Sequence, residues 1–362
     1  MSDSDVSVRA ADPVGGHACP AALAYPFGEA VPTPGTSVEV APGLRWHRIP
    51  LAGSPDHVNL WLVEEADGWT AVDCGVVTDA AVAAWDGVVA SLPRRPAIVR
   101  VLVTHLHSDH LGLAHWLCER WGATLWMSQA DHLQARRATE ASSEALEDAI
   151  GLLARNGLAD AGAAEAIRAR EPASRARMPR VPASARYVRP GESVRAGERD
   201  WRAIPGYGHA PEHLAFHCGA LGVLVSGDML LPTITAHVGV TAAAPDGDPL
   251  AGYLESIARF AALPADTLVL PSHGRPFRGI DARLAQVGAR LARRLEETLA
   301  ACDRPRSAAE LLPEAVRRGR LAHRAGLALT GTLAMLHHHW HAGRLRRAED
   351  ADGVLRFCRA DG

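Results

Sequence analysis

Four side chains that can bind a metal ion stand within six consecutive positions of this chain. They directly follow an apolar run, and they are His105, His107, Asp109 and His110. Imidazole nitrogens combined with a carboxylate oxygen suit a borderline divalent ion such as zinc. Because alternate side chains of an extended segment point the same way, His105, His107 and Asp109 are expected to converge. The next residue, His110, then faces a neighbouring point, so this one segment could supply ligands to two adjacent ions.

Three further candidate ligands follow along the chain. His209 lies in a Gly-His-x-Pro-x-His turn, Asp228 follows one apolar run, and His273 follows another. Junctions between strands and loops are where a rigid scaffold presents reactive groups. A single carboxylate at Asp228 could bridge two ions through its two oxygens. Two ions about 3.5–4 Å apart can share a water molecule, lower its pKa and polarise a substrate oxygen, so hydrolysis would need no serine or cysteine nucleophile.

These seven residues, together with Asp73 in the segment 72–75, resemble the five ordered motifs of the metallo-β-lactamase superfamily over residues 40–280. The resemblance implies an α/β fold, an αββα sandwich with a dinuclear site at one edge of its two sheets. It implies two divalent metal ions, zinc first, with iron or manganese as the other choices. It also implies the ligand sets: His105, His107 and His209 for one ion; Asp109, His110 and His273 for the other; Asp228 as the bridge; and Asp73 as a residue that orients ligands.

By the same resemblance the chain is a dinuclear metal-dependent hydrolase of a small ester or thioester, of the acyl-CoA, glutathione thioester or lactone class. A metal-bridging hydroxide oriented by Asp109 would attack the carbonyl, with Asp228 as the second catalytic carboxylate. The exported β-lactamases of the superfamily lack an aspartate matching Asp228, so antibiotic hydrolysis is not expected. Two enzyme alternatives stay open: a two-metal ribonuclease or phosphodiesterase, and a mononuclear iron enzyme similar to persulfide dioxygenases. A metal-stabilised binding protein is the non-enzymatic alternative.

Composition narrows the classes of protein and the compartment. A formal net charge of −3 over 362 residues gives no general attraction to nucleic acid or to an anionic membrane. All 38 basic side chains are arginine, which excludes lysine Schiff-base chemistry and a GK[ST] phosphate loop. The acidic first residues do not resemble a signal peptide, and no apolar run approaches the ~20 residues that span a bilayer. The six cysteines are dispersed. We therefore expect a cytoplasmic protein with a small-molecule substrate and no membrane partner.

Hydrophobic patterns predict the elements that position the candidate ligands. Strands are expected at residues 58–63, 69–72, 98–103, 124–127, 201–204, 214–217, 222–226 and 267–270. Helices are expected at residues 78–89, 111–120 and 249–263. Residues 131–187 are rich in Ala, Arg and Glu with helical spacing, which predicts a helical insertion between two parts of a β-rich core.

The chain is expected to have three parts. Residues 1–37 form an N-terminal arm, residues 38–281 form the metallo-β-lactamase domain with its 131–187 insertion, and residues 282–362 form a smaller C-terminal domain. In the C-terminal part, helices are predicted at 282–301, 307–318 and 321–340, followed by a hairpin of strands at 344–348 and 354–359. Three helices and a hairpin resemble a winged-helix module.

The charge of this C-terminal part leaves two roles open. Residues 304–347 carry nine arginines against two glutamates. Such a surface could contact a phosphate backbone, or it could dock on the acidic remainder of the chain. We favour docking, and nucleic acid is kept only as an alternative partner. The insertion and the C-terminal helices are also apolar enough for a homodimer.

Other residues near the motifs have weaker signals. His213 is expected to support the ligands rather than to bind metal. Tyr207 could donate a hydrogen bond to a substrate oxyanion or simply fill the floor of the site, and His237 could line the pocket. Histidines also occupy positions 337–339 and 341. Adjacent helical positions point about 100° apart, so the three neighbouring side chains cannot bind one ion together. Only His337 and His341, at i and i+4, face the same way, and for this end of the helix we expect a solvated or domain-facing role ahead of metal binding.

Overall fold

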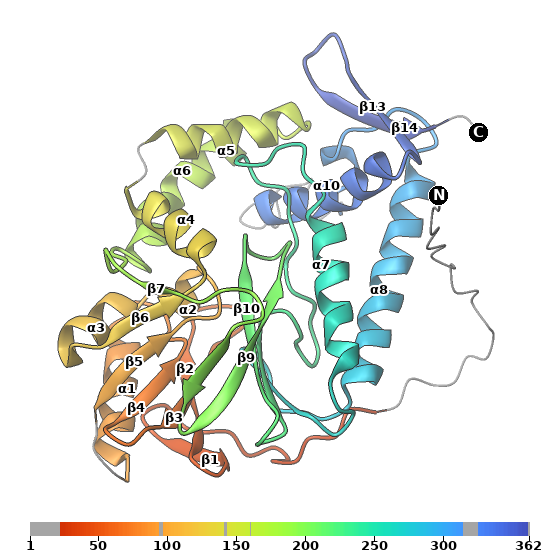
Figure 1. The fold of residues 1–362 in the computed structure, drawn as a ribbon. Helices are drawn as coiled ribbons and strands as arrows, with labels where there is room; N and C mark the ends of the chain where they lie inside the picture. Colours follow the sequence, from red (N-terminus) through yellow and green to blue (C-terminus); the bar gives the residue numbers. More distant parts are fainter. Residues whose placement is uncertain (1–21, 94–96, 141–142, 160, 314–324, 361–362) are drawn as a thin grey trace, which may run out of the picture.

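Two β-sheets pack face to face, and helices cover both outer faces (Figure 1). The computed structural model describes residues 22–93, 97–140, 143–159, 161–313 and 325–360. The four layers are the αββα sandwich expected from the motifs, so the predicted fold class is confirmed.

The first sheet has seven strands that lie in the order of the chain. They are β1 (Ser37–Ala41), β2 (Leu44–Pro50), β3 (His57–Glu64), β4 (Trp69–Val72), β5 (Ile98–Leu102), β6 (Thr124–Met127) and β7 (Arg186–Tyr187). Strands β1 to β4 are antiparallel, whereas β4 to β7 are parallel. Parallel strands end at the same edge of a sheet, so the segment that follows β5 emerges beside the one that follows β4.

The second sheet has five strands in the order β12-β11-β10-β9-β8. Their bounds are β8 (Ser193–Ala196), β9 (Arg199–Gly206), β10 (His213–Cys218), β11 (Val223–Gly227) and β12 (Leu268–Pro271). Strands β8 to β11 are antiparallel and β12 is parallel to β11. Strands β9, β11 and β12 therefore run in one direction, and the loops after all three leave the sheet at the same edge.

Three hydrophobic clusters join the layers. Between the sheets, Trp46 and Trp61 of the first sheet pack with Trp201 and Phe216 of the second. The outer face of the first sheet packs on α1 (Asp79–Ser91) and α3 (Ala114–Trp121). The outer face of the second sheet packs on three helices, which are α7 (Pro249–Ala258), α8 (Ile280–Ala301) and α10 (Ala325–His341).

The remaining helices are short or lie in the insertion. A single turn, α2 (Ser108–Leu111), follows β5. The region predicted as a helical insertion contains α4 (Gln129–Glu140), α5 (Ser143–Arg155) and α6 (Ala161–Ala176). A 3₁₀ turn at Arg259–Ala262 extends α7, and another lies at Ala309–Leu311. The predicted C-terminal hairpin is present as β13 (Leu345–Glu349) and β14 (Leu355–Arg359).

Some elements differ from the sequence prediction. Strands β1, β2, β7 and β8 were not predicted, because they are short or carry polar residues at buried positions, as His47 does in β2. The helix predicted at 111–120 is divided into α2 and α3 around Gly112, which packs against the carbonyl oxygen of Gly75. Within 307–313, the helix predicted at 307–318 is only a 3₁₀ turn, because the residue before Pro313 is extended. Residues 314–318 lie outside the described part.

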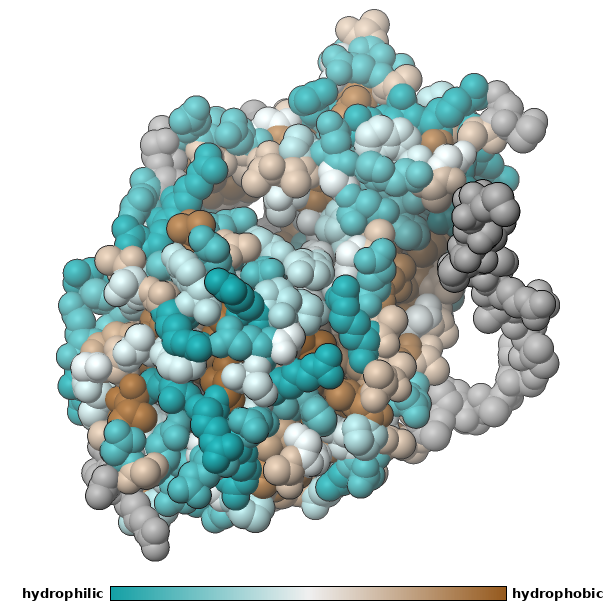
Figure 2. Space-filling view, viewed as in Figure 1, coloured by the Kyte–Doolittle hydropathy of each residue, from teal (hydrophilic) through white to brown (hydrophobic). Residues whose placement is uncertain are grey.

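The face shown in Figure 2 is largely hydrophilic, with hydrophobic residues in small separate areas. Large exposed apolar side chains are scattered along the chain: Val31, Val38, Leu133, Tyr187, Ile234 and Leu327. Single exposed apolar residues of this kind are ordinary on a protein surface. Across the described ranges, every helix is too short or too polar to cross a bilayer.

Candidate metal centre

All seven predicted ligands meet at the edge where β5, β9, β11 and β12 end. They form two groups in which the possible ligand atoms lie within 4.8 Å of one another: His105, His107, His209 and Asp228 in one, and Asp109, His110 and His273 in the other. These residues come from four loops of two sheets. The sandwich therefore gathers side chains that are up to 168 positions apart, from His105 to His273.

The local backbone decides how the 105–110 segment divides between the groups. His107 is extended, with φ −63° and ψ 151°, and α2 begins at the next residue. His105 and His107 therefore converge as an extended segment predicts. The expectation that Asp109 joins them was wrong, because the chain is already helical there. The helical turn brings Asp109 to His110 and His273 instead.

The first group is tight around the Nε2 atom of His105. His107 Nδ1 lies 3.0 Å from it, His209 Nε2 lies 3.2 Å from it, and Asp228 Oδ2 lies 3.9 Å from it. His209 Nε2 is also 3.1 Å from Asp228 Oδ2. Three imidazole nitrogens and one carboxylate oxygen thus face a common point, which is the usual number of ligands for a tetrahedral site.

The second group faces the other oxygen of the same carboxylate. Asp228 Oδ1 lies 3.6 Å from His110 Nε2 and 3.4 Å from His273 Nε2. Asp109 Oδ2 lies 3.7 Å and 3.6 Å from the same two nitrogens. Asp228 is therefore shared by both groups, one oxygen to each. Ser272 donates its hydroxyl hydrogen to Asp228 Oδ1 and fixes the orientation of the carboxylate.

Hydrogen bonds on the far side of the rings orient them toward the centre. The Nδ1–H groups of His209 and His273 donate to the backbone oxygens of His237 and His57, each at 2.7 Å. His110 Nδ1 donates to Asp73 Oδ2 at 2.8 Å. In each ring this bond leaves Nε2 free to act as a ligand.

The donor set fits divalent metal ions. His110 Nε2 is buried and has no hydrogen-bond partner among the described residues. Burial, followed by the neighbouring histidines, lowers the pKa of His105 well below its usual value, and burial lowers the pKa of His107 to about 3. These imidazoles are therefore neutral near pH 7 and their lone pairs are available.

The carboxylates make the centre attractive to positive charge. Burial lowers the pKa of His110, but Asp109, Asp73 and Asp228 outweigh it and raise the pKa to about 10. Burial also raises the pKa of Asp228, yet His273, His110 and His209 hold that pKa well below its usual value. Asp228 is thus ionised, and a point that stabilises a proton this strongly also favours a bound cation.

His213 lies directly behind the ligands. It is fully buried, its ring stacks on His105 at 4.9 Å between centroids, and its Nε2 accepts the backbone N–H of Asp228 at 3.2 Å. It belongs to neither ligand group, so it supports Asp228 as expected. Tyr207, the other candidate from this turn, has a hydroxyl that hydrogen-bonds the Glu212 side chain.

Sequence reasoning missed Asp131, which connects two ligand segments. This fully buried residue lies in the first turn of α4, and its Oδ2 and Oδ1 accept the backbone N–H groups of Leu106 and Glu212, each at 2.8 Å. Leu106 lies between His105 and His107, and Glu212 lies in the turn that carries His209. Burial outweighs these hydrogen bonds and raises the pKa of Asp131 to about 6.

A cavity of about 610 Å³ opens beside His107. Leu106 and Ser108 line it on one side, and residues of α4 and α6 form the opposite wall. Its volume falls within the range of small-molecule sites. The insertion therefore faces the candidate metal centre across this cavity.

Comparisons with known proteins agree with this geometry. Residues 53–273 match the sequence model of the Metallo-beta-lactamase superfamily, and residues 295–360 match that of the Metallo-beta-lactamase-like, C-terminal domain. A solved beta-lactamase domain protein from Burkholderia ambifaria is 44% identical with a TM-score of 0.86, over 93% of this chain and 98% of that one. A solved metallo-beta-lactamase family protein from Thermus thermophilus is 26% identical with a TM-score of 0.76, over 89% of this chain and 100% of that one. The chain belongs to the metallo-β-lactamase superfamily, whose members are generally metal-dependent hydrolases.

Proposed function

We propose that the protein is a dinuclear metal-dependent hydrolase of a small ester or thioester. The observation that carries this proposal is the position of Asp228. Its Oδ2 faces His209 at 3.1 Å, and its Oδ1 faces His273 at 3.4 Å. A carboxylate shared in this way suits two adjacent ions better than one, which favours a dinuclear hydrolase over a mononuclear iron enzyme.

Each group would hold one divalent ion, with Asp228 contacting both. Zinc is the first expectation, because mixed imidazole and carboxylate donors are its common ligands, and iron or manganese are the other choices. When bound, such ions acidify a water molecule and polarise a substrate carbonyl. The ligand sets proposed are the following: His105, His107 and His209; and Asp109, His110 and His273.

The protein's own groups then orient and carry protons. Asp109 has the most exposed carboxylate of the centre, at 20% of its side chain, against 11% for Asp228 and 2% for Asp73. Asp109 is therefore placed to orient the attacking water and to accept its proton. Asp228, whose pKa is held low by the surrounding histidines, stays a carboxylate throughout. Asp73 keeps His110 in the tautomer that directs Nε2 inward.

The cavity beside His107 supports a small substrate. Its volume of about 610 Å³ suits an acyl group with a modest leaving group. Apolar side chains of Leu106, Ala138 and Met178 line it together with the paired side chains of Glu171 and Arg175. The polymer alternative depends on the arginines of the C-terminal part, but Arg347 is paired with Asp246 at 2.7 Å and lies over the Trp340 ring. This favours the docking role for that charge.

A cytoplasmic location is part of the proposal. The five cysteines within the described residues are free thiols, which suits a reducing compartment.

Elemental analysis and a hydrolysis screen test the proposal together. We expect two metal ions per chain in the purified protein, and hydrolysis of an acyl-CoA, glutathione thioester or homoserine lactone but not of RNA. Asp228→Ala should lower both the metal content and the rate. Asp200→Ala, at an aspartate of β9 whose side chain is 68% exposed, is the matched control and should change neither.

Four outcomes would contradict it. Protein without stoichiometric metal, or unchanged metal content and activity in Asp228→Ala, would exclude the dinuclear mechanism. One iron per chain would favour the persulfide dioxygenase-like alternative, and cleavage of RNA alone would favour the phosphodiesterase alternative.

A further inference from the structure

The histidine-rich end of α10 contacts one short segment, residues 246–248, which leads into α7. The hydrogen bonds join His337 Nδ1 to Gly247 O at 3.0 Å, His338 Nδ1 to Asp248 Oδ2 at 3.1 Å, and His341 Nε2 to Asp246 O at 2.7 Å. His337 and His341 lie one turn apart on the same side of the helix, and His338 reaches the segment from the neighbouring position. We therefore assign these three histidines a structural role, which is to hold residues 246–248, and not metal binding.

Residues 246–248 lead directly into α7, and Asp248 is its N-terminal capping residue. Asp248 Oδ1 accepts the backbone N–H of Ala251 at 3.0 Å and caps the helix, while its Oδ2 faces His338. The first residues of α7 pack closely against the loop that carries His209. A Cβ atom at Gly208 would collide with the Pro249 carbonyl oxygen. A shift of the start of α7 would therefore move the backbone next to His209.

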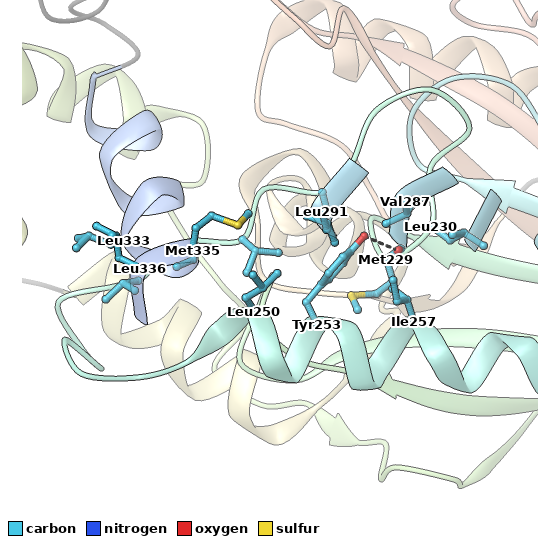
Figure 3. Packing of buried hydrophobic residues seen from close by; sticks show 14 of the residues in the cluster. Met229, Leu230, Leu250, Tyr253, Ile257, Val287, Leu291, Leu333, Met335 and Leu336 are labelled. Carbon is cyan, nitrogen blue, oxygen red and sulfur yellow. Dashed lines mark hydrogen bonds between the residues drawn. The ribbon is translucent and has the colours of Figure 1, made fainter. Parts of the chain in front are cut away.

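The same helix also supports Asp228. Tyr253 of α7 is buried, and its hydroxyl donates to the backbone oxygen of Met229 at 3.2 Å (Figure 3). Met229 directly follows Asp228. Figure 3 shows Met335 and Leu336 of α10 near Leu250, and Tyr253 next to Met229, all within one hydrophobic cluster. Packing therefore continues from α10 through α7 to the residue beside the shared carboxylate.

A second connection runs through residues 237–240. The backbone oxygen of His237 accepts the Nδ1–H of His209 at 2.7 Å. Three residues later, Val240 donates its backbone N–H to Thr330 O of α10 at 3.2 Å, and Thr330 Oγ1 lies 3.3 Å from His237 Nε2. The carbonyl that orients His209 thus belongs to a segment that α10 also fixes.

We propose that α10 positions the metal ligands His209 and Asp228, so that the C-terminal domain sets the metal affinity of the centre. His337 is then a positioning residue that acts through residues 246–248 and α7. The inference rests on the proposed function in one respect, since it requires that the centre binds metal. Loss of the contact from His337 would let the start of α7 relax and would weaken the fixed geometry that a metal ion needs.

A pair of leucine variants on the same helix tests this proposal. His339 matches His337 closely: the two are 2% and 1% exposed, and His339 Nε2 donates to the backbone oxygen of Leu295 in α8 at 2.8 Å. His337→Leu and His339→Leu therefore each remove one buried hydrogen bond to a carbonyl. Both should lower the thermal midpoint, His339→Leu by less, because the buried Nδ1 of His339 has no hydrogen-bond partner among the described residues and the substitution removes this atom too. Only His337→Leu should raise the zinc dissociation constant, by about 3–10-fold in chelator competition, somewhat less than residues that touch a ligand directly.

Two further measurements separate positioning from general packing. His337→Leu should alter the visible absorption spectrum of the Co²⁺-loaded protein, whereas His339→Leu should leave it unchanged. His337→Asn should restore the wild-type zinc affinity, because its amide nitrogen occupies the place of Nδ1 and can donate to Gly247 O.

The proposal is overturned if both leucine variants keep the wild-type zinc affinity while their midpoints fall, or if both lose affinity equally. Wild-type protein that binds no zinc, cobalt, iron or manganese would contradict this inference and the proposed function alike. Wild-type protein that binds zinc but hydrolyses no ester or thioester would contradict the proposed function alone. In that case the separation of His337→Leu from His339→Leu would still support the positioning role.

Discussion

The carboxylate of Asp131 fixes two ligand segments at once, and an asparagine could fix only one. Both oxygens of Asp131 accept backbone N–H groups, from Leu106 and from Glu212. In Asp131→Asn one of these groups would face an amide NH₂ and lose its acceptor inside the protein. We expect a loss of about 2 kcal/mol in the free energy of unfolding and a roughly tenfold weaker zinc affinity. Urea unfolding and chelator competition measure the two effects.

The same chemical change at the surface is the control for this variant. Asp86 of α1 is 46% exposed and pairs with Arg120 at 2.9 Å. Asp86→Asn should change neither unfolding nor zinc affinity beyond the error, because exposed ion pairs contribute little. An Asp131→Asn protein with normal zinc affinity would show that these two segments do not depend on the shared carboxylate.

The buried imidazole of His47 makes stability depend on pH. Neither ring nitrogen has a hydrogen-bond partner among the described residues, the ring packs on Trp85 at 4.5 Å, and burial lowers its pKa to about 3. The unfolded chain takes up a proton on His47 below pH 6.5, and the folded chain does so only near pH 3. The stability contributed by the neutral ring is therefore complete above pH 6.5 and is lost as the pH falls toward 3.

This dependence predicts the behaviour of His47→Leu. Between pH 7 and pH 5, the wild-type free energy of unfolding should fall by about 2 kcal/mol more than that of the variant. Urea unfolding at the two pH values measures the difference. Equal pH dependence in the two proteins would mean that His47 titrates alike in the folded and unfolded chains.

At the scale of residues, the sequence predicted which side chains meet and two of the residues that support them, Asp73 and His213, but not Asp131. Spacing and residue type were sufficient for His105, His209 and Asp228, because their chemistry is visible in the side chain. Asp131 acts on backbone amides that lie 25 and 81 positions away. Every residue except proline carries such an amide, so no sequence pattern distinguishes its two partners.

At the scale of elements, the contact between α7 and the turn that carries His209 depends on a glycine. Gly208 has φ +89°, and a Cβ atom there would collide with the Pro249 carbonyl oxygen. Gly208→Ala should lower the free energy of unfolding by more than the roughly 1–2 kcal/mol expected for left-handed strain alone, and should also weaken zinc binding. Thermal unfolding and chelator competition test both expectations.

A second glycine, Gly222, separates the effect of left-handed strain from the effect of the collision. It lies in the turn between β10 and β11 with φ +61°, and a Cβ atom there would meet nothing within 4 Å. Gly222→Ala thus has the strain without the collision, and it should leave zinc affinity unchanged. Equal effects of the two substitutions on stability and affinity would refute the role of the Gly208 contact.

Helices and strands were predicted well where their residues form a clear apolar run in the sequence. Strands β3, β5 and β11 are largely buried, and their apolar runs were recognised close to their observed bounds. Strand β2 was missed although most of its residues are buried, since Arg45, His47 and Arg48 interrupt its apolar residues. The alternation expected to bring Asp109 beside His107 failed for a related reason, because the single helical turn of α2 is too short to have a periodicity of its own.

At the scale of the whole molecule, the second sheet and the C-terminal helices share one core. A single cluster contains Leu224 of β11, Tyr253 of α7, Leu333 of α10 and Phe357 of β14. Helix α8 begins at Ile280 and continues across the domain boundary predicted at 281.

A shared core predicts one cooperative unfolding transition. In scanning calorimetry we expect a single peak, with calorimetric and van't Hoff enthalpies in agreement. Two variants test this expectation: Leu62→Ala, between the first sheet and the helices α1 and α3, and Leu336→Ala, on α10. Each removes a fully buried side chain and should lower the free energy of unfolding by about 2–5 kcal/mol. Both should shift the whole peak to lower temperature. A second, lower peak that appears only in Leu336→Ala would show instead that the C-terminal helices unfold as an independent unit, and α10 could then hardly fix the ligands of the metal centre.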